Sequence, residues 1–480
     1  MEQLYTENKI IIGREEEKLD LEKLLKSNQS ELLVMYGRRR IGKTYLVRNY
    51  FKDNMCYELS GTRGAVAAKQ LLNFTTELKK FTTKKKIEIP EHWQGAFILL
   101  QNYIDSIKSL KKKVIFFDEL PWLDGMHSGF LGAFDYFWNN WCTKRTDLVV
   151  VLCGSAASWM IDKIIGDKGG LHNRITKQLK LEPFTLLETE TFLRNKNVKL
   201  ERYQIVQLYM TMGGVPLYLN AVDASKSATQ NIENICFKKN GLLYSEFDNL
   251  YASLYKNPDV YIEIIKALAT KQSGMLRTEI AQKAKVSSGG YLTKILIELE
   301  ESNFITSSLP NNKLVKYKIY RIVDEYSIFY LKFIEKLKFS KVGTWASLQT
   351  SQSYISWCGF AFEGICLKHV EAIKLKLGIS AIYTEQSVWY SKKDKAQIDL
   401  VLQRADKCIN ICEIKFATIP YELTAKYAAA LQQKIMAYRA ATKTNYTIFL
   451  TLITTFGVKE NMHKINNVDQ VIVVDDLFKA

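Results

Sequence analysis

The feature that most constrains this chain is a glycine-rich stretch that follows a run of apolar residues. Residues 37–44 read GRRRIGKT and fit the pattern G-x-x-x-x-G-K-[ST]. The run ELLVMYG (31–37) precedes it, and TYLVRNYF (44–51) has the periodicity of a helix. A strand, a glycine-rich turn and a helix in this order predict a loop that wraps around phosphate groups.

Four residues of this loop have predicted roles at a nucleotide. Gly37 and Gly42 let the backbone approach phosphate oxygens with its N–H groups. Lys43 is expected to reach the β- and γ-phosphates, and the Thr44 hydroxyl is expected to hold Mg²⁺.

A second apolar run, KKVIFFDEL (112–120), ends in two carboxylates. Asp118 is expected to orient Mg²⁺ through water, and Glu119 to act as the general base that activates a water molecule. A kinase that passes phosphate to another substrate does not need such a base, so the pair favours hydrolysis of a nucleoside triphosphate. The alternative is a strand that ends in two solvated acids.

The apolar runs also indicate the fold class. LVVVLCGS (148–155) is a third run without polar alternation, and strands of this kind are buried on both faces. We therefore predict a parallel sheet between helices within a multidomain α/β protein. A chain of 480 residues is expected to form more than one domain, at roughly 150 residues each.

Two strand candidates near the C-terminus carry acids and a lysine. Asp399 lies in IDLVLQR, and Glu413 and Lys415 lie in CINICEIKF. Side chains alternate along a strand, so Glu413 and Lys415 share a face. A buried carboxylate on so apolar a strand is costly without a metal ion or a cation. We expect the two acids to bind Mg²⁺ or Mn²⁺ and the lysine to stabilise developing charge; a strand-edge acid and a simple ion pair are the alternatives.

The region between these centres has the pattern of a winged helix-turn-helix. Three short helical patterns fall between residues 264 and 299, and a lysine-rich hairpin follows. The turn before the third helix offers Ser287 and Ser288 to DNA bases, and the start of that helix offers Tyr291. The predicted contacts of the hairpin with phosphates are Lys313, Lys316, Lys318 and Arg321. The third helix is acidic near its end, so packing or protein interaction is the alternative.

The charge balance favours a polyanionic partner. The chain has 67 Lys and Arg against 50 Asp and Glu, a net charge of +17. DNA is the expected partner, and a generally basic protein is the alternative. The sequence has no apolar run long enough to span a membrane and no pattern of a signal peptide. The eight scattered cysteines read as reduced thiols, so a cytoplasmic location is expected.

The loop and the acid pair together resemble the AAA+/STAND-type ATPases, in particular the prokaryotic "archaeal ATPase" family with a C-terminal nuclease-like domain. Gly13 and Arg14 are similar to a family element near the adenine. Ser155 resembles the polar residue of the sensor 1 strand, and Arg174 the arginine that senses phosphate or acts as a finger, although Asn173 stands where glycine is usual. Pro216 resembles the lid proline beside the base. Each residue has an alternative. Gly13 and Arg14 would instead simply start a helix, and Ser155 would cap a turn. Arg174 would form a surface ion pair, and Pro216 would end a helix.

The C-terminal pattern D-x13-E-x-K resembles the PD-(D/E)xK nuclease superfamily. Glu363, in FAFEGI, matches the helical acid of that fold, and Gln433 lies where some members carry glutamine. The resemblance implies a restriction-endonuclease-like α/β domain. Glu363 is also compatible with an ordinary helix position.

The resemblance gives four expected domains and two hypotheses for function. The domains are a P-loop ATPase core (1–185), a helical lid (186–250), a winged helix-turn-helix (251–340) and a nuclease-like domain (341–480). The first hypothesis is an ATPase that acts on DNA with a metal-dependent nuclease site. The alternative is a STAND-type switch that ATP controls, with a C-terminal domain that binds without cutting. A homo-oligomer is a further expectation, and ATP is preferred to GTP by resemblance alone.

Overall fold

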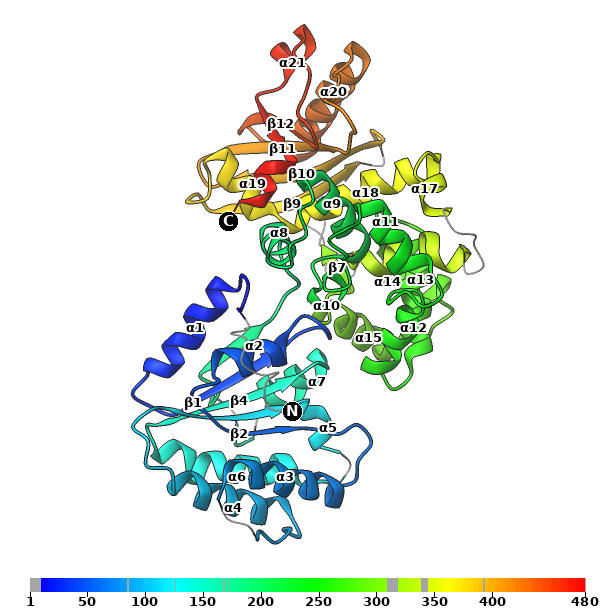
Figure 1. The fold of residues 1–480 in the computed structure, drawn as a ribbon. Coiled ribbons are helices and arrows are strands. Elements are labelled where there is room, and N and C mark those ends of the chain that lie inside the picture. Colours follow the sequence, from blue (N-terminus) through cyan, green and yellow to red (C-terminus); the bar gives the residue numbers. More distant parts are fainter. Residues whose placement is uncertain are drawn as a thin grey trace. The chain divides into compact units, whose positions relative to one another are not determined.

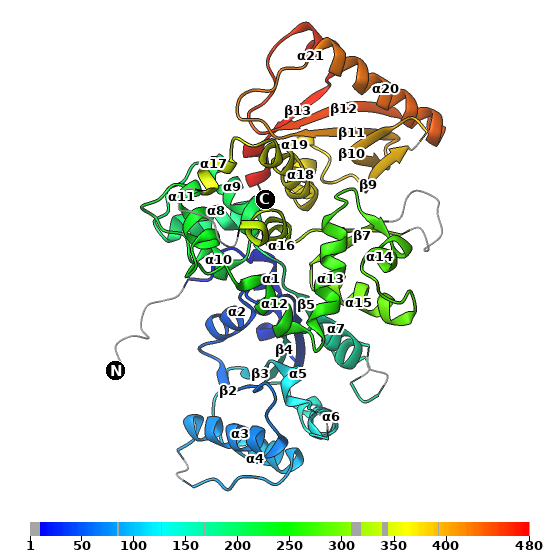
Figure 2. The ribbon, with the colours of Figure 1, turned by 90° about the vertical axis from the view of Figure 1, so that its right-hand side faces the viewer.

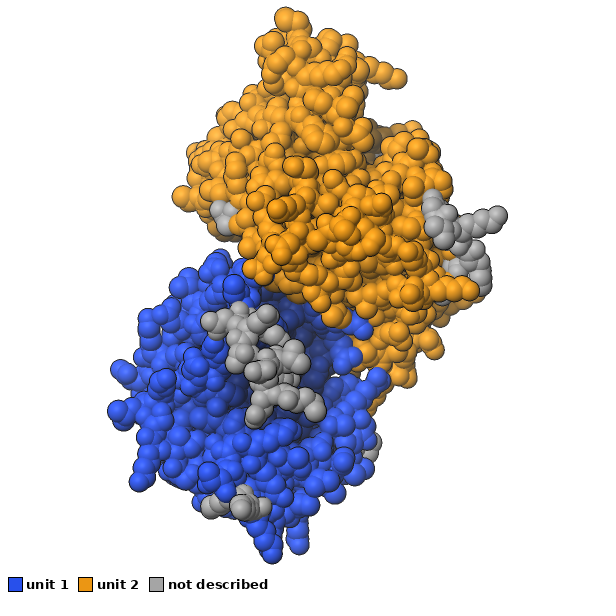
Figure 3. Space-filling view, in the orientation of Figure 1, with its two compact units in different colours: residues 1–182, 297–303 blue, residues 183–296, 304–480 orange. Residues whose placement is uncertain are grey.

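The computed structural model describes residues 10–479 except 84–85, 126, 167–168, 172, 309–317, 338–343 and 392. The chain divides into two compact units, which Figure 3 shows in different colours. The first contains residues 1–182 and 297–303, and the second contains residues 183–296 and 304–480. The four expected domain ranges remain predictions.

The first unit is built on a parallel sheet of five strands, as the apolar runs predicted. The strand order is β2-β3-β4-β1-β5, so β4 lies between the strand before the glycine-rich loop and the strand that ends in the acid pair. Every strand pair is parallel. The strands are β1 (Glu31–Tyr36), β2 (Met55–Ser60), β3 (Lys113–Asp118), β4 (Leu148–Gly154) and β5 (Lys177–Lys180).

Helices cover both faces of this sheet, as Figure 1 shows. Alternate strand residues such as Leu32 and Val34 share a core with three helices on one face, and Leu33 and Met35 share a core with two helices on the other. The first three are α3 (Ala67–Phe81), α4 (Trp93–Asp105) and α6 (Phe130–Asn140), and the other two are α1 (Glu15–Lys26) and α2 (Lys43–Tyr50). The sheet is therefore buried on both faces, as predicted.

The second unit begins with helices, where the sequence predicted them. They are α8 (Leu186–Asn195), α9 (Arg202–Met212), α10 (Pro216–Leu219), α11 (Ala228–Ile232) and α12 (Glu246–Leu254). Three further helices follow, interleaved with a small antiparallel sheet of order β6-β8-β7. In chain order, these elements are α13 (Pro258–Ala269), β6 (Met275–Leu276), α14 (Arg277–Lys283), α15 (Gly290–Glu301), β7 (Ile305–Ser308) and β8 (Ile319–Ile322). Residues 297–301 of α15 belong to the first unit. Lys313 and Lys316, predicted to contact DNA, lie outside the described residues.

The C-terminal part of the second unit is a mixed five-stranded sheet of order β13-β12-β11-β10-β9. The strands β9, β10 and β11 are antiparallel, and β11, β12 and β13 are parallel. The elements are β9 (Thr384–Ser391), β10 (Ala396–Arg404), β11 (Cys408–Lys415), α20 (Ala425–Thr442), β12 (Thr447–Thr454), α21 (Met462–Asn467) and β13 (Gln470–Val473). Figure 2 shows α20 on one side of this sheet, and α18 (Gln352–Lys368) and α19 (Val370–Leu377) on the other. Among the described helices, none is long and apolar enough to cross a membrane.

The stretch FAFEGICLKHVEAIKLKL (360–377) reads in the sequence as one helix, but it is divided between two helices, α18 and α19, which meet at His369. The imidazole Nε2 of His369 accepts a hydrogen bond of 2.9 Å from the backbone N–H of Leu186, the first residue of α8. Its Nδ1 lies 2.8 Å from the carbonyl oxygen of Ile365, so the neutral tautomer donates there. Packing against α8 thus explains a break that helical periodicity did not show.

Acid should destabilise the second unit through His369. Burial lowers the pKa of its imidazole to about 4. In the unfolded chain the imidazole binds a proton as the pH falls through about 6.5, whereas in the folded unit it does so only near pH 4. The free energy of unfolding therefore decreases as the pH falls between these two values. The loss is at most about 3 kcal/mol. Thermal unfolding at pH 7 and pH 4.5 measures it. The His369→Gln variant should show a smaller pH dependence than the wild type, and the His463→Gln variant an unchanged one.

Candidate functional site

The glycine-rich loop adopts the conformation that its glycines predicted. Gly37 and Gly42 have φ values of 138° and 92°, which side chains disfavour. A Cβ atom at Gly37 would lie 2.4 Å from the carbonyl oxygen of Leu181. The buried Lys43 ammonium donates to the carbonyl oxygens of Gly37, at 2.7 Å, and Arg38, at 2.8 Å. Burial lowers the pKa of Lys43, so a phosphate group would supply a counter-charge that the loop carbonyls provide only in part.

The predicted magnesium residues lie side by side. The Thr44 hydroxyl at the start of α2 donates a hydrogen bond of 2.7 Å to Asp118 Oδ2 at the end of β3. Asp118 is buried and its other oxygen accepts from the backbone N–H of Glu119, at 2.9 Å. A hydroxyl and a carboxylate in contact are hard oxygen donors of the kind that Mg²⁺ takes beside a nucleotide. The residues present therefore fit Mg²⁺ at this place.

Glu119, the predicted base, is in the left-handed region with a φ of 47°. The hydroxyl of Ser155, directly after β4, donates to Glu119 Oε2 at 2.8 Å. The Arg39 guanidinium lies 3.9 Å from Glu119 Oε1. The strand order explains the hydrogen bond between Ser155 and Glu119, because these residues follow β4 and β3, which are neighbours and end at the same edge of the sheet. Ser155 is thus beside the acid pair, and Arg39 is a neighbour that sequence reasoning missed. The role of Ser155 as the polar residue of a sensor 1 strand remains a prediction.

The predicted element before the loop also reaches it. Gly13 and Arg14 both have φ values of 61°, and α1 begins at the next residue. The buried Arg14 guanidinium donates to the carbonyl oxygen of Ile41 at 3.4 Å and pairs with Glu17 at 3.2 Å. Arg14 therefore braces the loop through its backbone, and contact with an adenine remains a prediction.

Two residues of the resemblance are not joined to this site. The Arg174 side chain is exposed, and the structure gives its guanidinium no partner among the described residues. Its predicted contact with phosphate remains a prediction. Pro216 begins α10 in the second unit, so its expected place beside the base is likewise a prediction.

The second constellation lies within the C-terminal sheet. Asp399 on β10 sits at an irregularity of the pairing with β9, and its Oδ2 accepts a hydrogen bond of 2.9 Å from the backbone N–H of Ile414 on β11. Glu413 and Lys415 share one face of β11, as the spacing predicted, and Lys415 Nζ lies 2.9 Å from Glu413 Oε1. Irregular pairing of this kind commonly re-aims a side chain beside a functional site.

Electrostatic interactions bring Glu363 of α18 into the same group. Burial, followed by the charge of Asp399, raises the pKa of Glu363 to about 7. Burial and the charge of Glu413 raise the pKa of Asp399 to about 6. Arg321 of β8 lies 4.0 Å from Glu363 Oε1, so it faces this acid, whereas the sequence predicted a DNA phosphate for it. The four predicted residues Glu363, Asp399, Glu413 and Lys415 therefore form one group.

Helix α20 contributes two residues that sequence reasoning missed. Lys434 Nζ lies 2.7 Å from Glu413 Oε2, and the Tyr427 hydroxyl donates to Glu413 Oε1. Burial opposes ionisation of Glu413, but Lys415 and Lys434 outweigh it and lower its pKa. Tyr427 and Lys434 are seven residues apart, a spacing that places both on one face of a helix. Gln433, which lies where some nucleases carry glutamine, is exposed and compatible with an ordinary helix position.

The chemistry of this group fits a divalent cation, but its side chains are not arranged as metal ligands. Asp399 and Glu413 supply hard oxygens, and a cation would relieve the mutual repulsion of these two buried carboxylates and the half-buried Glu363. In the described ranges, however, no three His, Cys, Asp or Glu side chains are placed to hold a metal ion together. Both oxygens of Glu413 already accept from Lys415, Lys434 and Tyr427. A metal ion would therefore have to replace at least one of these partners.

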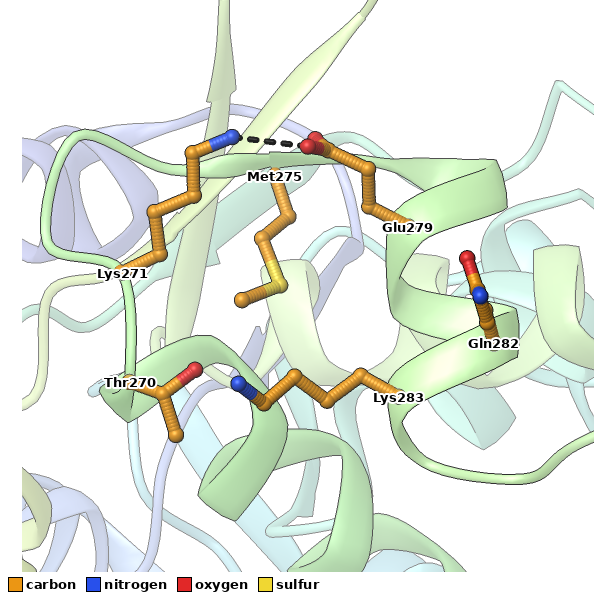
Figure 4. Close-up of a pocket in the computed structure, with 6 residues that line it drawn as sticks. All are labelled: Thr270, Lys271, Met275, Glu279, Gln282 and Lys283. Atoms are coloured by element: carbon orange, nitrogen blue, oxygen red, sulfur yellow. Dashed lines mark hydrogen bonds and ion pairs between the residues drawn. The ribbon is translucent and has the colours of Figure 1, made fainter.

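A third place of interest is an open pocket of about 600 Å³ in the second unit. It is lined by Thr270, Lys271, Met275, Glu279, Gln282 and Lys283. Figure 4 shows the Lys271 ammonium directed at Glu279, at 2.8 Å, and the Lys283 side chain extended toward Thr270. None of the six residues belongs to the loop or to the acid group, and the ion pair of Lys271 with Glu279 leaves no arrangement here that selects a ligand.

Known proteins resemble this chain over the first unit and beyond. Residues 11–222 match the family model of an ATPase domain predominantly from Archaea. An uncharacterized protein of Methanocaldococcus jannaschii is 26% identical over 415 residues, which are 85% of this chain and 88% of that protein. An uncharacterized ATP-binding protein of the same organism is 36% identical over 44 residues, 9% of this chain and 75% of that protein.

Among solved structures, the Walker-type ATPase of Pyrococcus abyssi has a TM-score of 0.50 at 20% identity and covers 67% of this chain and 96% of its own. This likeness concerns the fold. Together with the family match over residues 11–222 and the contacts around Lys43 and Asp118, it supports a P-loop ATPase-like domain in this chain. The chain is thus a multidomain α/β protein with a parallel-sheet ATPase core and a separate mixed sheet near its C-terminus.

Proposed function

We propose that this ATPase acts on DNA and that the acid group of its second unit is a metal-dependent nuclease site. The observation that carries the proposal is the convergence of Glu363, Asp399 and Glu413 with Lys415, because phosphodiester hydrolysis uses buried carboxylates for metal binding and a cation for developing charge. The net charge of +17 supports a polyanionic partner.

In the ATPase centre, each group has a task that its position supports. The N–H groups of the loop and the Lys43 ammonium would bind the phosphates, and Thr44 and Asp118 would hold Mg²⁺, which would neutralise charge there. Glu119 leaves the Ser155 hydroxyl and accepts a proton from the attacking water. Ser155 then lies free to face the transferred phosphoryl group.

In the proposed nuclease centre, Asp399 and Glu413 would hold Mg²⁺ or Mn²⁺, which would polarise the scissile phosphate. Lys415 stands beside Glu413 and stabilises the attacking hydroxide or the developing charge. Glu363, with its pKa near 7, is placed to take up a proton as well as to help bind the cation.

The helices α13, α14 and α15 with the β7–β8 hairpin are proposed as a winged helix-turn-helix that binds DNA. Ser287, Ser288 and Tyr291 support this role, because all three are exposed around the start of α15, from which such helices read base edges. Arg321 is not counted among the DNA contacts, since it faces Glu363.

Substitutions of Asp399 and Lys415 test the nuclease proposal. We expect the wild-type chain to nick DNA with Mg²⁺ or Mn²⁺, and Asp399→Ala and Lys415→Ala to lower the rate about 10²-fold or more, because each removes a metal ligand or charge stabilisation. Nicking of supercoiled plasmid measures the rate. Asp406→Ala, which removes an exposed acid after β10, should leave the rate unchanged. Cutting that persists in both variants would show that the activity lies elsewhere.

A STAND-type switch remains the second candidate, and the saturated carboxylate of Glu413 favours it. In that case the C-terminal sheet only binds a partner. The switch predicts slow ATP turnover, no nicking in any metal, and assembly that depends on the nucleotide. Light scattering with and without a non-hydrolysable ATP analogue, run beside the nicking assay, distinguishes the two functions.

A further inference from the structure

The carboxylate of Glu413 has more cationic partners than the proposed chemistry uses. Lys415 Nζ lies 2.9 Å from Oε1 and Lys434 Nζ lies 2.7 Å from Oε2, so an ammonium group covers each oxygen. Tyr427 donates a further hydrogen bond. The D-x13-E-x-K pattern requires only one lysine, Lys415, which leaves the role of Lys434 unexplained.

The burial of Glu413 explains why a second cation is needed when no metal ion is bound. The Glu413 side chain is 2% exposed, and Asp399 is nearby. A buried carboxylate beside another acid is stable only if cations and hydrogen bonds compensate its lost hydration. Lys434 gives this compensation at the oxygen that Lys415 does not cover.

The two lysines differ in how they are held. Lys415 lies on β11 itself, and its ammonium is 5.1 Å from the centre of the Tyr427 ring as well as beside Glu413. Lys434 comes from α20, and its side chain is 22% exposed against 31% for Lys415, so the two differ in their contacts and not in their access to solvent. Among the described residues, Glu413 is the one that accepts a hydrogen bond from the Lys434 ammonium, and the charge of Lys434 also acts on Asp399. A flexible four-carbon stem that reaches solvent can leave Glu413 without a change of backbone.

We propose that Lys434 is a built-in counter-cation that occupies the metal side of Glu413 and must leave before a divalent ion can bind. Lys434 thereby sets the metal affinity of the site and keeps the buried acids paired while metal is absent. This inference rests on the proposed metal site and adds to it a residue that controls loading.

Metal binding, measured without DNA or nucleotide, tests this role. The full chain is titrated with Mn²⁺, and free Mn²⁺ is followed by electron paramagnetic resonance. We expect Lys434→Met to bind Mn²⁺ about tenfold more tightly than the wild type, since the competitor is absent. The control Lys426→Met removes an exposed lysine from the same helix and should bind as the wild type does. Adding Asp399→Asn to Lys434→Met should abolish the gain, which locates it at this site.

Lys434→Gln provides a second, polar variant in case the methionine impairs folding, and circular dichroism checks both. Affinity in these folded variants that is equal to or below that of the wild type would overturn the inference. The proposed nuclease function fails separately. If Mn²⁺ binds more tightly in the variants but no variant cuts DNA, the role of Lys434 stands and the nuclease does not. If the wild type cuts DNA but the Lys434 variants bind Mn²⁺ no more tightly, the nuclease proposal stands and the role of Lys434 does not.

Discussion

The Glu119→Gln variant should bind ATP as the wild type does but hydrolyse it roughly 10²–10⁴-fold more slowly, the usual contribution of a general base. Glutamine keeps the shape of the side chain and still accepts the hydrogen bond from Ser155. It cannot take a proton from water. The contacts of Lys43, Thr44 and Asp118, which would bind the nucleotide, do not involve the Glu119 carboxylate.

Phosphate release under single-turnover conditions measures hydrolysis, and a fluorescent ATP analogue measures binding. Glu91→Gln is the matched control, because Glu91 is an exposed acid of the same unit. Hydrolysis at the wild-type rate in Glu119→Gln would exclude Glu119 as the base. Loss of nucleotide binding in that variant would instead assign Glu119 a structural role.

The ATPase core shows which parts of a sheet can be predicted from sequence. The central strands β1, β3 and β4 are buried on both faces, so each is a continuous apolar run. The outer strands β2 and β5 were not predicted. MCYELS in β2 is only partly buried, and KQLK in β5 is short and polar at the sheet edge. An edge strand is defined by its neighbour rather than by its own composition.

At the C-terminal site, too, what depends on a single strand was predictable and what depends on packing between elements was not. Alternation along one strand was enough to place Glu413 and Lys415 on a common face. The half-polar edge strand β9 was missed, as were Tyr427 and Lys434, because their approach to Glu413 depends on how α20 packs against the sheet. The seven-residue spacing of that pair was visible, but nothing in the sequence says which helix face meets the acids.

Removal of the Lys43 ammonium should abolish useful nucleotide binding. In Lys43→Ala we expect ATP affinity to fall at least about 100-fold, since a charge-assisted hydrogen bond to an ionised group contributes about 1.5–3 kcal/mol and Lys43 is expected to reach two phosphates. Without nucleotide, its ammonium donates only to the carbonyl oxygens of Gly37 and Arg38, which are loop backbone, so the fold itself should tolerate the change. Isothermal titration with ATP and Mg²⁺ measures affinity, and thermal unfolding verifies that the unit is folded.

Lys69→Ala, at an exposed lysine of α3, should bind ATP normally. Retained affinity in a folded Lys43→Ala chain would contradict the phosphate-binding role, because no neutral methyl group can replace a buried cation at a triphosphate.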